Sequence, residues 1–508
     1  MHSDTIGNSD ILPTGRVQSI KWVAGILIRR SIVRKEPEKN LGLAFVHTAL
    51  LHWRLGSITN RTMADKQDWQ AIAARKREER ESRIPSEWKI PTPQLPDKSI
   101  KDIHAFSEDS GLFTNRELEI TGSTASEVVA KVATGEWTAV EVTKALCKRA
   151  AVAQQLVNCL TEILFDQAIA RAEELDDYFR REGKTVGPLH GLPISLKDQF
   201  NIKGLDSTIG YVSYVGKPAP SNSTLTDLLL NAGAILYTKT NVPATLMMGE
   251  SVNNVFGRTC HPYNRELTSG GSSGGESALL CFRGSLLGVG TDIGGSIRHP
   301  ASYTGLYALR PSQGRVSYQN AVNTYLGQEA VQSAAGPMCH SPADIKLFMK
   351  ALADQKPWLK DASIVPIPWR SDEEKLPEKL CFGFGMGDGT VTPSPPLRRA
   401  MEITKQKLEA AGHKVVNYIP YEHIEASELI TKMWSADGGE EFQRDTDASG
   451  EPLHPHLEAW LGKSANVWIC QTIIGSKHAD IVDAGKEADR LRDMANTACT
   501  NSTCTEVA

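Results

Sequence analysis

Two glycine- and serine-rich stretches in the middle of the chain have the composition of a catalytic loop. The first is Ser269-Gly-Gly-Ser-Ser-Gly-Gly275, and the second is Gly290-Thr-Asp-Ile-Gly-Gly-Ser-Ile-Arg298. Glycine permits a positive φ and a close approach to a ligand. Small residues also let successive N–H groups converge on an anion. Such stretches could form a flexible linker, a phosphate-binding loop, or an oxyanion hole beside a serine nucleophile.

The surrounding residues favour the third interpretation. The two stretches flank the mostly apolar run Ala278–Val289, which should be largely buried, so a flexible linker fits poorly. A phosphate-binding loop of the Walker type needs Gly-Lys-Ser/Thr, which neither of the two stretches contains. The letters G-x-S-x-G occur as Gly270-Gly-Ser-Ser-Gly274, but no apolar strand leads into them, as a nucleophile elbow requires.

A serine nucleophile needs a base to accept its proton. Four histidines lie near these motifs in the sequence: His190, His261, His299 and His340. The other available base is a lysine in its neutral form, which requires burial to disfavour the charge. Lys197 suits this role because it closes the apolar run Gly191-Leu-Pro-Ile-Ser-Leu196.

Taken together, these segments resemble the amidase signature family, and within it the fungal acetamidase or general amidase type. The Lys197 segment, extended to Asp198, matches the family's lysine motif, and the two glycine–serine stretches match its signature. The spacing between Ser272 and Ser296, 296 − 272 = 24, is the family's spacing. Three further segments also match: Thr238-Lys-Thr-Asn-Val-Pro243, Asn253-Asn-Val-Phe-Gly-Arg258 and Gly305-Leu-Tyr-Ala-Leu-Arg-Pro311.

The resemblance implies a Ser–cis-Ser–Lys triad. In that triad Ser296 attacks the amide carbonyl, and Ser272, on a cis peptide after Gly271, passes protons between Ser296 and the general base Lys197. Water then hydrolyses the acyl-enzyme, and no metal or organic cofactor is needed. The residues whose N–H groups the resemblance assigns to the oxyanion hole are Ile293, Gly294, Gly295 and Ser296.

Three residues next to the triad are expected to support it. We expect Asp292 and Arg298 to hold the nucleophile loop through hydrogen bonds rather than to take part in the chemistry. Ser273 either supports the proton relay or is a small residue needed for close packing, and the two readings are weighted equally. Met247, Met248 and Tyr303 are candidates for the acyl pocket, with ordinary core packing the better default.

The pattern of apolar residues predicts the elements that position this site. Thr124-Ala-Ser-Glu127 is a capping box that starts a helix. Gly191–Lys197 and Ala234–Lys239 are typical of buried strands, and Ser223–Ala232 of a helix between them, which indicates an α/β layered sheet. Further helices are expected at Thr138–Ala153, Phe165–Arg181, Ser341–Leu352 and Pro396–Ala411, and further strands at Leu380–Phe384 and Lys414–Ile419.

The predicted fold class is α/β, in the form of the amidase signature fold: a large mixed, twisted β-sheet covered on both faces by α-helices. We divide the 508 residues into four parts. Residues 1–62 are an extension expected to be poorly ordered, and residues 63–122 are a helical and proline-rich arm. Residues 123–464 are the amidase signature domain. Residues 465–508 are a divergent segment, for which a truncated chain is one explanation.

Composition restricts the possible partners. The net charge is −4, so no pull toward nucleic acid or an anionic membrane is expected. Nine cysteines at irregular spacing, without C-x-x-C, indicate reduced thiols and no metal site. No signal peptide and no apolar run long enough to cross a membrane are seen, so we predict a cytoplasmic protein. The expected partners are a small-molecule amide and water; a homodimer is left open.

The leading hypothesis is therefore an amidase that converts a carboxamide to a carboxylic acid and ammonia. One alternative is a catalytically impaired amidase-like protein with a regulatory or binding role. A second is an amidotransferase subunit that delivers ammonia to a transfer-RNA-linked reaction. The sequence does not select among small aliphatic, aryl and fatty amides, because one fold supports many pockets.

Overall fold

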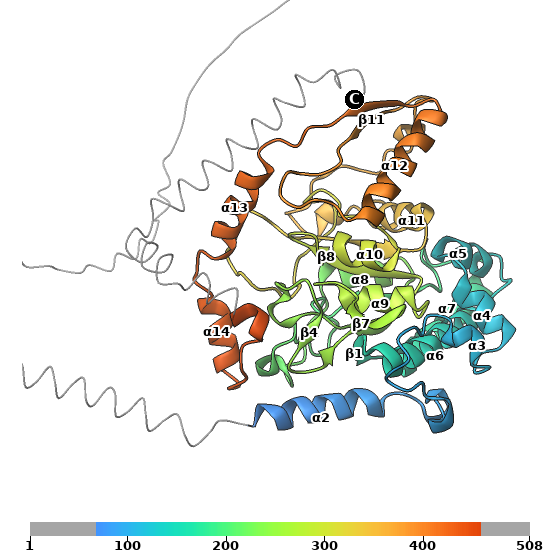
Figure 1. The fold of residues 1–508 in the computed structure, drawn as a ribbon. Coiled ribbons are helices and arrows are strands. Elements are labelled where there is room, and N and C mark those ends of the chain that lie inside the picture. Colours follow the sequence, from blue (N-terminus) through green and yellow to red (C-terminus); the bar gives the residue numbers. More distant parts are fainter. Residues whose placement is uncertain (1–67, 459–508) are drawn as a thin grey trace, which may run out of the picture. The chain divides into compact units, whose positions relative to one another are not determined.

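A six-stranded mixed sheet forms the centre of the computed structural model, which describes residues 68–458 (Figure 1). Its strands lie in the order β1-β3-β2-β8-β10-β9. Strand β2 is parallel to β3 and β8, whereas β1, β10 and β9 are added antiparallel. The bounds are β1 Leu160–Ile163, β2 Pro193–Lys197, β3 Ile235–Thr240, β8 Leu287–Asp292, β9 Tyr307–Ala308 and β10 Ala334–Cys339.

Helices cover both faces of this sheet because successive strand residues point to opposite sides. In β3, Leu236 joins one apolar cluster, while Ile235 and Tyr237 join another. The helices of the described region are α2 Trp69–Ser82, α3 Phe106–Asp109, α4 Asn115–Gly122, α5 Ala125–Ala133, α6 Ala139–Val157, α7 Phe165–Glu182, α8 Thr224–Asn231, α9 Gly274–Cys281, α10 Arg298–Thr304, α11 Pro342–Ala353, α12 Pro395–Ala410, α13 His423–Trp434 and α14 Glu440–Asp447.

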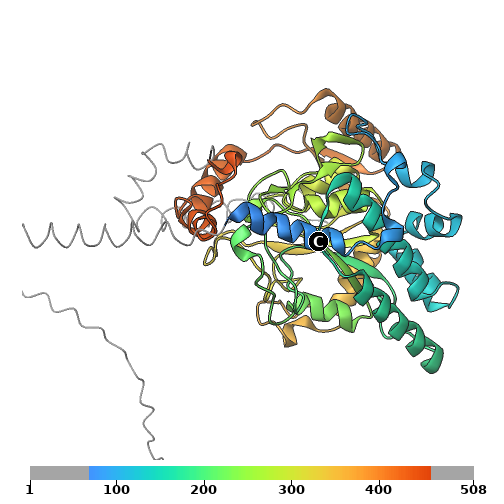
Figure 2. The same ribbon diagram turned by 90° about the horizontal axis from the view of Figure 1, so that it is seen from below.

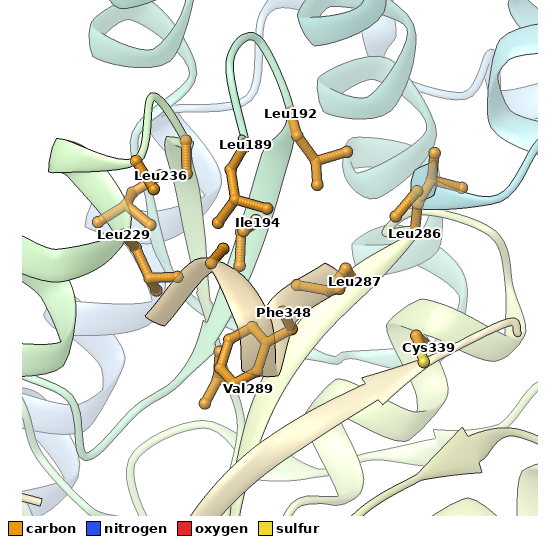
Figure 3. Packing of buried hydrophobic residues seen from close by; sticks show 14 of the residues in the cluster. Leu189, Leu192, Ile194, Leu229, Leu236, Leu286, Leu287, Val289, Cys339 and Phe348 are labelled. Carbon is orange, nitrogen blue, oxygen red and sulfur yellow. The ribbon is translucent and has the colours of Figure 1, made fainter. Parts of the chain in front are cut away.

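The first cluster packs α5, α8 and α11 against the sheet. Figure 3 shows side chains of β2 and β8, among them Ile194 and Val289, meeting Phe348 of α11. The second cluster packs α6, α7 and α9 on the other face. Strand β2 is buried along its whole length, which fixes where Lys197 can lie. The predicted mixed sheet with helices on both faces is therefore confirmed.

Local signals in the sequence also hold. Thr124 and Glu127 form the predicted capping box at the start of α5. Asp68 is the N-cap that precedes α2 and accepts from two backbone N–H groups; α2 itself lies beside β1 (Figures 1 and 2). Arg80 of α2 donates to the Leu160 carbonyl of β1 at 2.8 Å.

The sequence suggested that the alternating strands and helices all build one sheet. In the structure the last two predicted strands form a sheet of their own. Strands β11 Cys381–Phe384 and β12 Lys414–Asn417 pair in parallel with each other as a separate two-stranded sheet. Two further pairs join β4 Val252–Asn253 to β5 Gly257–Arg258, and β6 Cys260–His261 to β7 Asn264–Thr268. Four strands of the central sheet, β1, β8, β9 and β10, were not predicted; β10 contains Gly336 and Pro337, which argue against a central strand.

No helix within residues 68–458 is both long enough and apolar enough to span a bilayer. The segments predicted at 1–62 and 465–508 lie outside the described residues.

Candidate active site

Lys197 lies at the carboxyl end of β2 with none of its side chain exposed. Its Nζ is 2.7 Å from the Ser272 hydroxyl and 2.8 Å from the Thr291 hydroxyl. No carboxylate among the described residues forms a salt bridge with it. The amine is thus held by two hydroxyl groups in an enclosed site.

Burial changes the protonation of this amine. Loss of solvent lowers the pKa of Lys197 to about 7, against a partial opposing effect of the Asp292 and Glu276 carboxylates. Burial likewise raises the pKa of Glu276 to about 7, although Ser195 and Thr240 donate to its oxygens. A lysine with a pKa of about 7 is neutral in a large fraction at physiological pH, as a general base must be.

The backbone immediately before Ser272 adopts a conformation that requires glycine. The peptide bond between Gly271 and Ser272 is cis. A Cβ on Gly271 would lie 2.5 Å from the Met248 carbonyl oxygen, and Gly270 has φ +93°. Ser272 then leads into α9, whose residues from Gly274 to Leu280 are buried, so the hydroxyl is fixed against Lys197 by a packed helix.

The loop that carries Ser296 connects β8 to α10 and is organised by Asp292. The Asp292 carboxylate accepts from the N–H groups of Gly295 at 2.7 Å and Ile297 at 3.1 Å. Both of its oxygens also accept from the Arg298 guanidinium at 2.9 Å. Burial opposes ionisation, but these hydrogen bonds lower the pKa of Asp292 to about 2. Asp292 and Arg298 therefore hold the loop closed.

Ser272 and Ser296 line one small cavity of about 20 Å³, together with Thr291 and Ile293. The two serine segments meet where the Ser273 N–H donates to the Ser296 carbonyl at 3.2 Å. No hydrogen bond joins the hydroxyls of Ser272 and Ser296 in the described part of the chain. The structure thus brings Lys197 and Ser272 into direct contact and places Ser296 beside them without that last contact.

The four N–H groups assigned to the oxyanion hole are not equivalent. That of Gly295 is directed at Asp292. Those of Ile293, Gly294 and Ser296 donate to no other described residue. Within residues 68–458, three of these main-chain donors therefore have no acceptor, and two of them, Ile293 and Ser296, belong to residues that line the cavity; the fourth holds the loop.

The remaining candidates fall mostly outside the contact network of Lys197. The Ser273 hydroxyl accepts from the Thr291 N–H at 3.3 Å and is not bonded to Lys197, which favours a packing role. Met247 lines the cavity, but Met248 packs in a core cluster with Phe442. Tyr303 is 54% exposed and stacks on His299.

None of the four nearby histidines contacts either serine hydroxyl. His261 and His340 bond to the carbonyls of Tyr303 and Ser285, and His190 accepts from the Val186 N–H. The fourth, His299, stacks its ring on Tyr303. In the same range of residues, 68–458, no group of three or more histidine, cysteine, aspartate or glutamate side chains could hold a metal ion.

Two residues that touch this site were not predicted from the sequence. The Thr291 hydroxyl accepts from Lys197 and donates to Gln199 Oε1 at 2.5 Å. Thr291 belongs to the quoted signature stretch, and Gln199 follows Lys197 by two positions, but neither residue type by itself indicates a proton network.

Comparison with known proteins also points to an enzyme that acts on amides. The profile of the Amidase family matches residues 141–488, which extends into the segment we separated at residue 465. A protein of Curvularia clavata named "Putative amidase kk1C" is 63% identical over 399 residues, or 78% of this chain and 72% of that protein. An "Acetamidase" of Emericella nidulans is 46% identical over 401 residues, again 78% of this chain and 72% of that protein.

A solved structure named "Fatty acid amide hydrolase" superposes with a TM-score of 0.79 at 37% identity, covering 85% of this chain and 76% of that one. The chain therefore belongs to the amidase family, adopts the amidase signature fold, and is a hydrolase that acts on amides.

Proposed function

We propose that this protein hydrolyses a carboxamide to a carboxylic acid and ammonia through an acyl-enzyme on Ser296, with Ser272 and Lys197 as its proton relay. The observation that carries the proposal is the 2.7 Å contact between the buried Lys197 amine and the Ser272 hydroxyl, at the wall of the cavity that Ser296 also lines. General-base catalysis of this kind contributes about 10²–10⁴-fold to a rate.

In the first half-reaction, Ser296 Oγ attacks the carbonyl carbon. Its proton passes to Ser272 Oγ while the Ser272 proton passes to Lys197 Nζ. This requires the two hydroxyls to come within hydrogen-bonding distance when substrate fills the cavity; catalytic contacts are often longer in the free enzyme. The N–H groups of Ile293, Gly294 and Ser296, which donate to no other described residue, suit the negative oxygen of the tetrahedral intermediate.

The same relay then works in reverse. The lysinium returns its proton through Ser272 to the departing nitrogen, so ammonia leaves and the Ser296 ester remains. In the second half-reaction a water molecule gives its proton to the relay and attacks the ester. Collapse of that intermediate releases the carboxylic acid and restores the Ser296 hydroxyl and the neutral lysine.

A short acyl group suits the cavity best. About 10–15 Å³ holds one water molecule, so a cavity of about 20 Å³ accommodates a group of roughly that size beside the two serines. An acetamidase is also among the relatives. We therefore expect small aliphatic carboxamides to be better substrates than long-chain ones.

We also assign the activity to the cytoplasm, since every cysteine within residues 68–458 is a free thiol.

The test is ammonia release from a panel of amides by the full chain, by Ser296→Ala and by Ser302→Ala. Ser302 is an exposed serine on α10 near Ser296 and serves as the matched control. We expect Ser296→Ala to lose more than 10³-fold and Ser302→Ala to remain within twofold. Equal background release by the wild type and Ser296→Ala would instead support the impaired, binding-only alternative.

A further inference from the structure

A chain of buried hydrogen bonds extends from Lys197 away from the two serines. Lys197 contacts Thr291, and the Thr291 hydroxyl is 2.5 Å from Gln199 Oε1. The Gln199 Nε2 group donates in turn to the Val322 carbonyl at 3.1 Å and to the Tyr318 hydroxyl at 2.5 Å. Gln199 and Lys197 have no exposed surface, so water does not compete for these bonds.

The direction of each bond in this chain is fixed by the Val322 carbonyl, which can only accept. The end of Gln199 that faces it must therefore be the NH₂ group, and the carbonyl end must face Thr291. The Val322 N–H also donates to the Gln199 backbone carbonyl at 2.8 Å, which holds the two segments together. Because Gln199 Oε1 can only accept, the Thr291 hydroxyl must donate its proton in this hydrogen bond.

This assignment determines what Thr291 can do for the lysine. A hydroxyl whose single proton is already donated can only accept from Lys197. A neutral amine has two N–H bonds and one lone pair. One N–H is then directed to Thr291, and the lone pair is available to the Ser272 hydroxyl 2.7 Å away. If Thr291 kept its proton, it could donate to that lone pair and compete with Ser272.

We propose that Gln199 is a positioning residue: by holding the proton of the Thr291 hydroxyl, it leaves the lone pair of Lys197 free for Ser272. This role rests on the proposed function, in which Lys197 is the base. The logic resembles that of the aspartate in a Ser-His-Asp triad, which fixes the tautomer of the base without reacting itself.

The test is Gln199→Met, which fills similar space and removes the acceptor. Thr291 is then free to donate to the lysine, which stabilises the neutral amine and occupies its lone pair. We expect kcat for ammonia release to fall roughly 10–100-fold, KM to stay within about twofold, and the acid midpoint of the kcat/KM profile to move to lower pH. Gln199→Asn withdraws the carbonyl by one methylene and should shift the midpoint in the same direction.

Gln154→Met is the matched control because Gln154 is another buried glutamine, bonded to the Leu160 N–H at 2.7 Å. It should lower the melting temperature and leave the acid midpoint unchanged. A folded Gln199→Met or Gln199→Asn with wild-type kcat and midpoint would overturn the positioning role alone, provided that Lys197→Met is inactive. Activity in Lys197→Met would overturn both this role and the proposed triad.

Discussion

The protonation of Lys197 should set the pH dependence of the enzyme. The lysine acts as a base only when neutral, so kcat/KM should rise with pH through the pKa of the free enzyme and then level off. With a pKa lowered by burial to about 7, the neutral fraction falls about tenfold between pH 8 and pH 6. An ordinary lysine would lose about 100-fold over the same range and would not level off below pH 10.

The assay is kcat/KM for ammonia release between pH 5.5 and 9.5, with folding checked by circular dichroism at each pH. Glu276 needs a control because burial raises its pKa to about 7 as well. Gln can replace Glu276, because its two partners, Ser195 and Thr240, are hydroxyls that can also accept. In Glu276→Gln we expect the midpoint to persist and to move to lower pH, since one carboxylate that favours the lysinium is gone.

Two results would refute this reasoning. A wild-type profile that still rises at pH 9.5 would mean that Lys197 is not sufficiently desolvated to act as a neutral base near pH 7. Loss of the midpoint in Glu276→Gln would mean that Glu276, not Lys197, is the titrating group.

Three further outcomes are expected. Lys76→Met should reduce the free energy of unfolding in urea by about 3–5 kcal/mol, because it removes the cation 2.6 Å from Glu162 in a buried site; a change below 1 kcal/mol would contradict this. Gly294→Ala should lower kcat/KM at least tenfold with little change in melting temperature, since the new Cβ would lie 2.4 Å from the Trp434 ring; unchanged kinetics would show that the loop tolerates displacement. Met247→Ala should widen the cavity and shift the best substrate of an n-alkyl amide series to longer chains; an unchanged order would remove Met247 from the acyl pocket.

Much of the central fold was predictable because its signals are local. The apolar run before Lys197 is typical of a buried strand, and the observed β2 runs over Pro193–Lys197. The capping box at Thr124 fixes the start of α5 with two side-chain bonds between residues three apart. These features depend on neighbours in the sequence, not on the tertiary arrangement.

Two of the strands that were missed, β1 and β10, have no local signal. Strand β1 is only four residues long and contains Glu162, whose charge is neutralised by Lys76 from α2. Strand β10 carries Gly336 at a point where a Cβ would lie 2.1 Å from the Leu309 carbonyl oxygen, so the glycine permits a close approach rather than ending a strand. Both reasons involve residues far away in the chain.

In the candidate site, too, some features could be predicted from the sequence and others depend on tertiary contacts. The resemblance located Lys197, Ser272 and Ser296, and the structure places the first two in contact. The bond from the Gly295 N–H to Asp292 and the orientation of Thr291 by Gln199 depend on how three segments meet, so composition and spacing could not reveal them.

The central claim is that Ser296 becomes acylated during turnover. The most direct measurement is intact-mass and peptide mass spectrometry of the enzyme quenched within milliseconds of mixing with a saturating small amide. We predict an adduct of the acyl mass on the peptide that contains Ser296, absent in Ser296→Ala and greatly reduced in Lys197→Met. An adduct on Ser272 instead, or turnover with no adduct on any serine, would contradict the account.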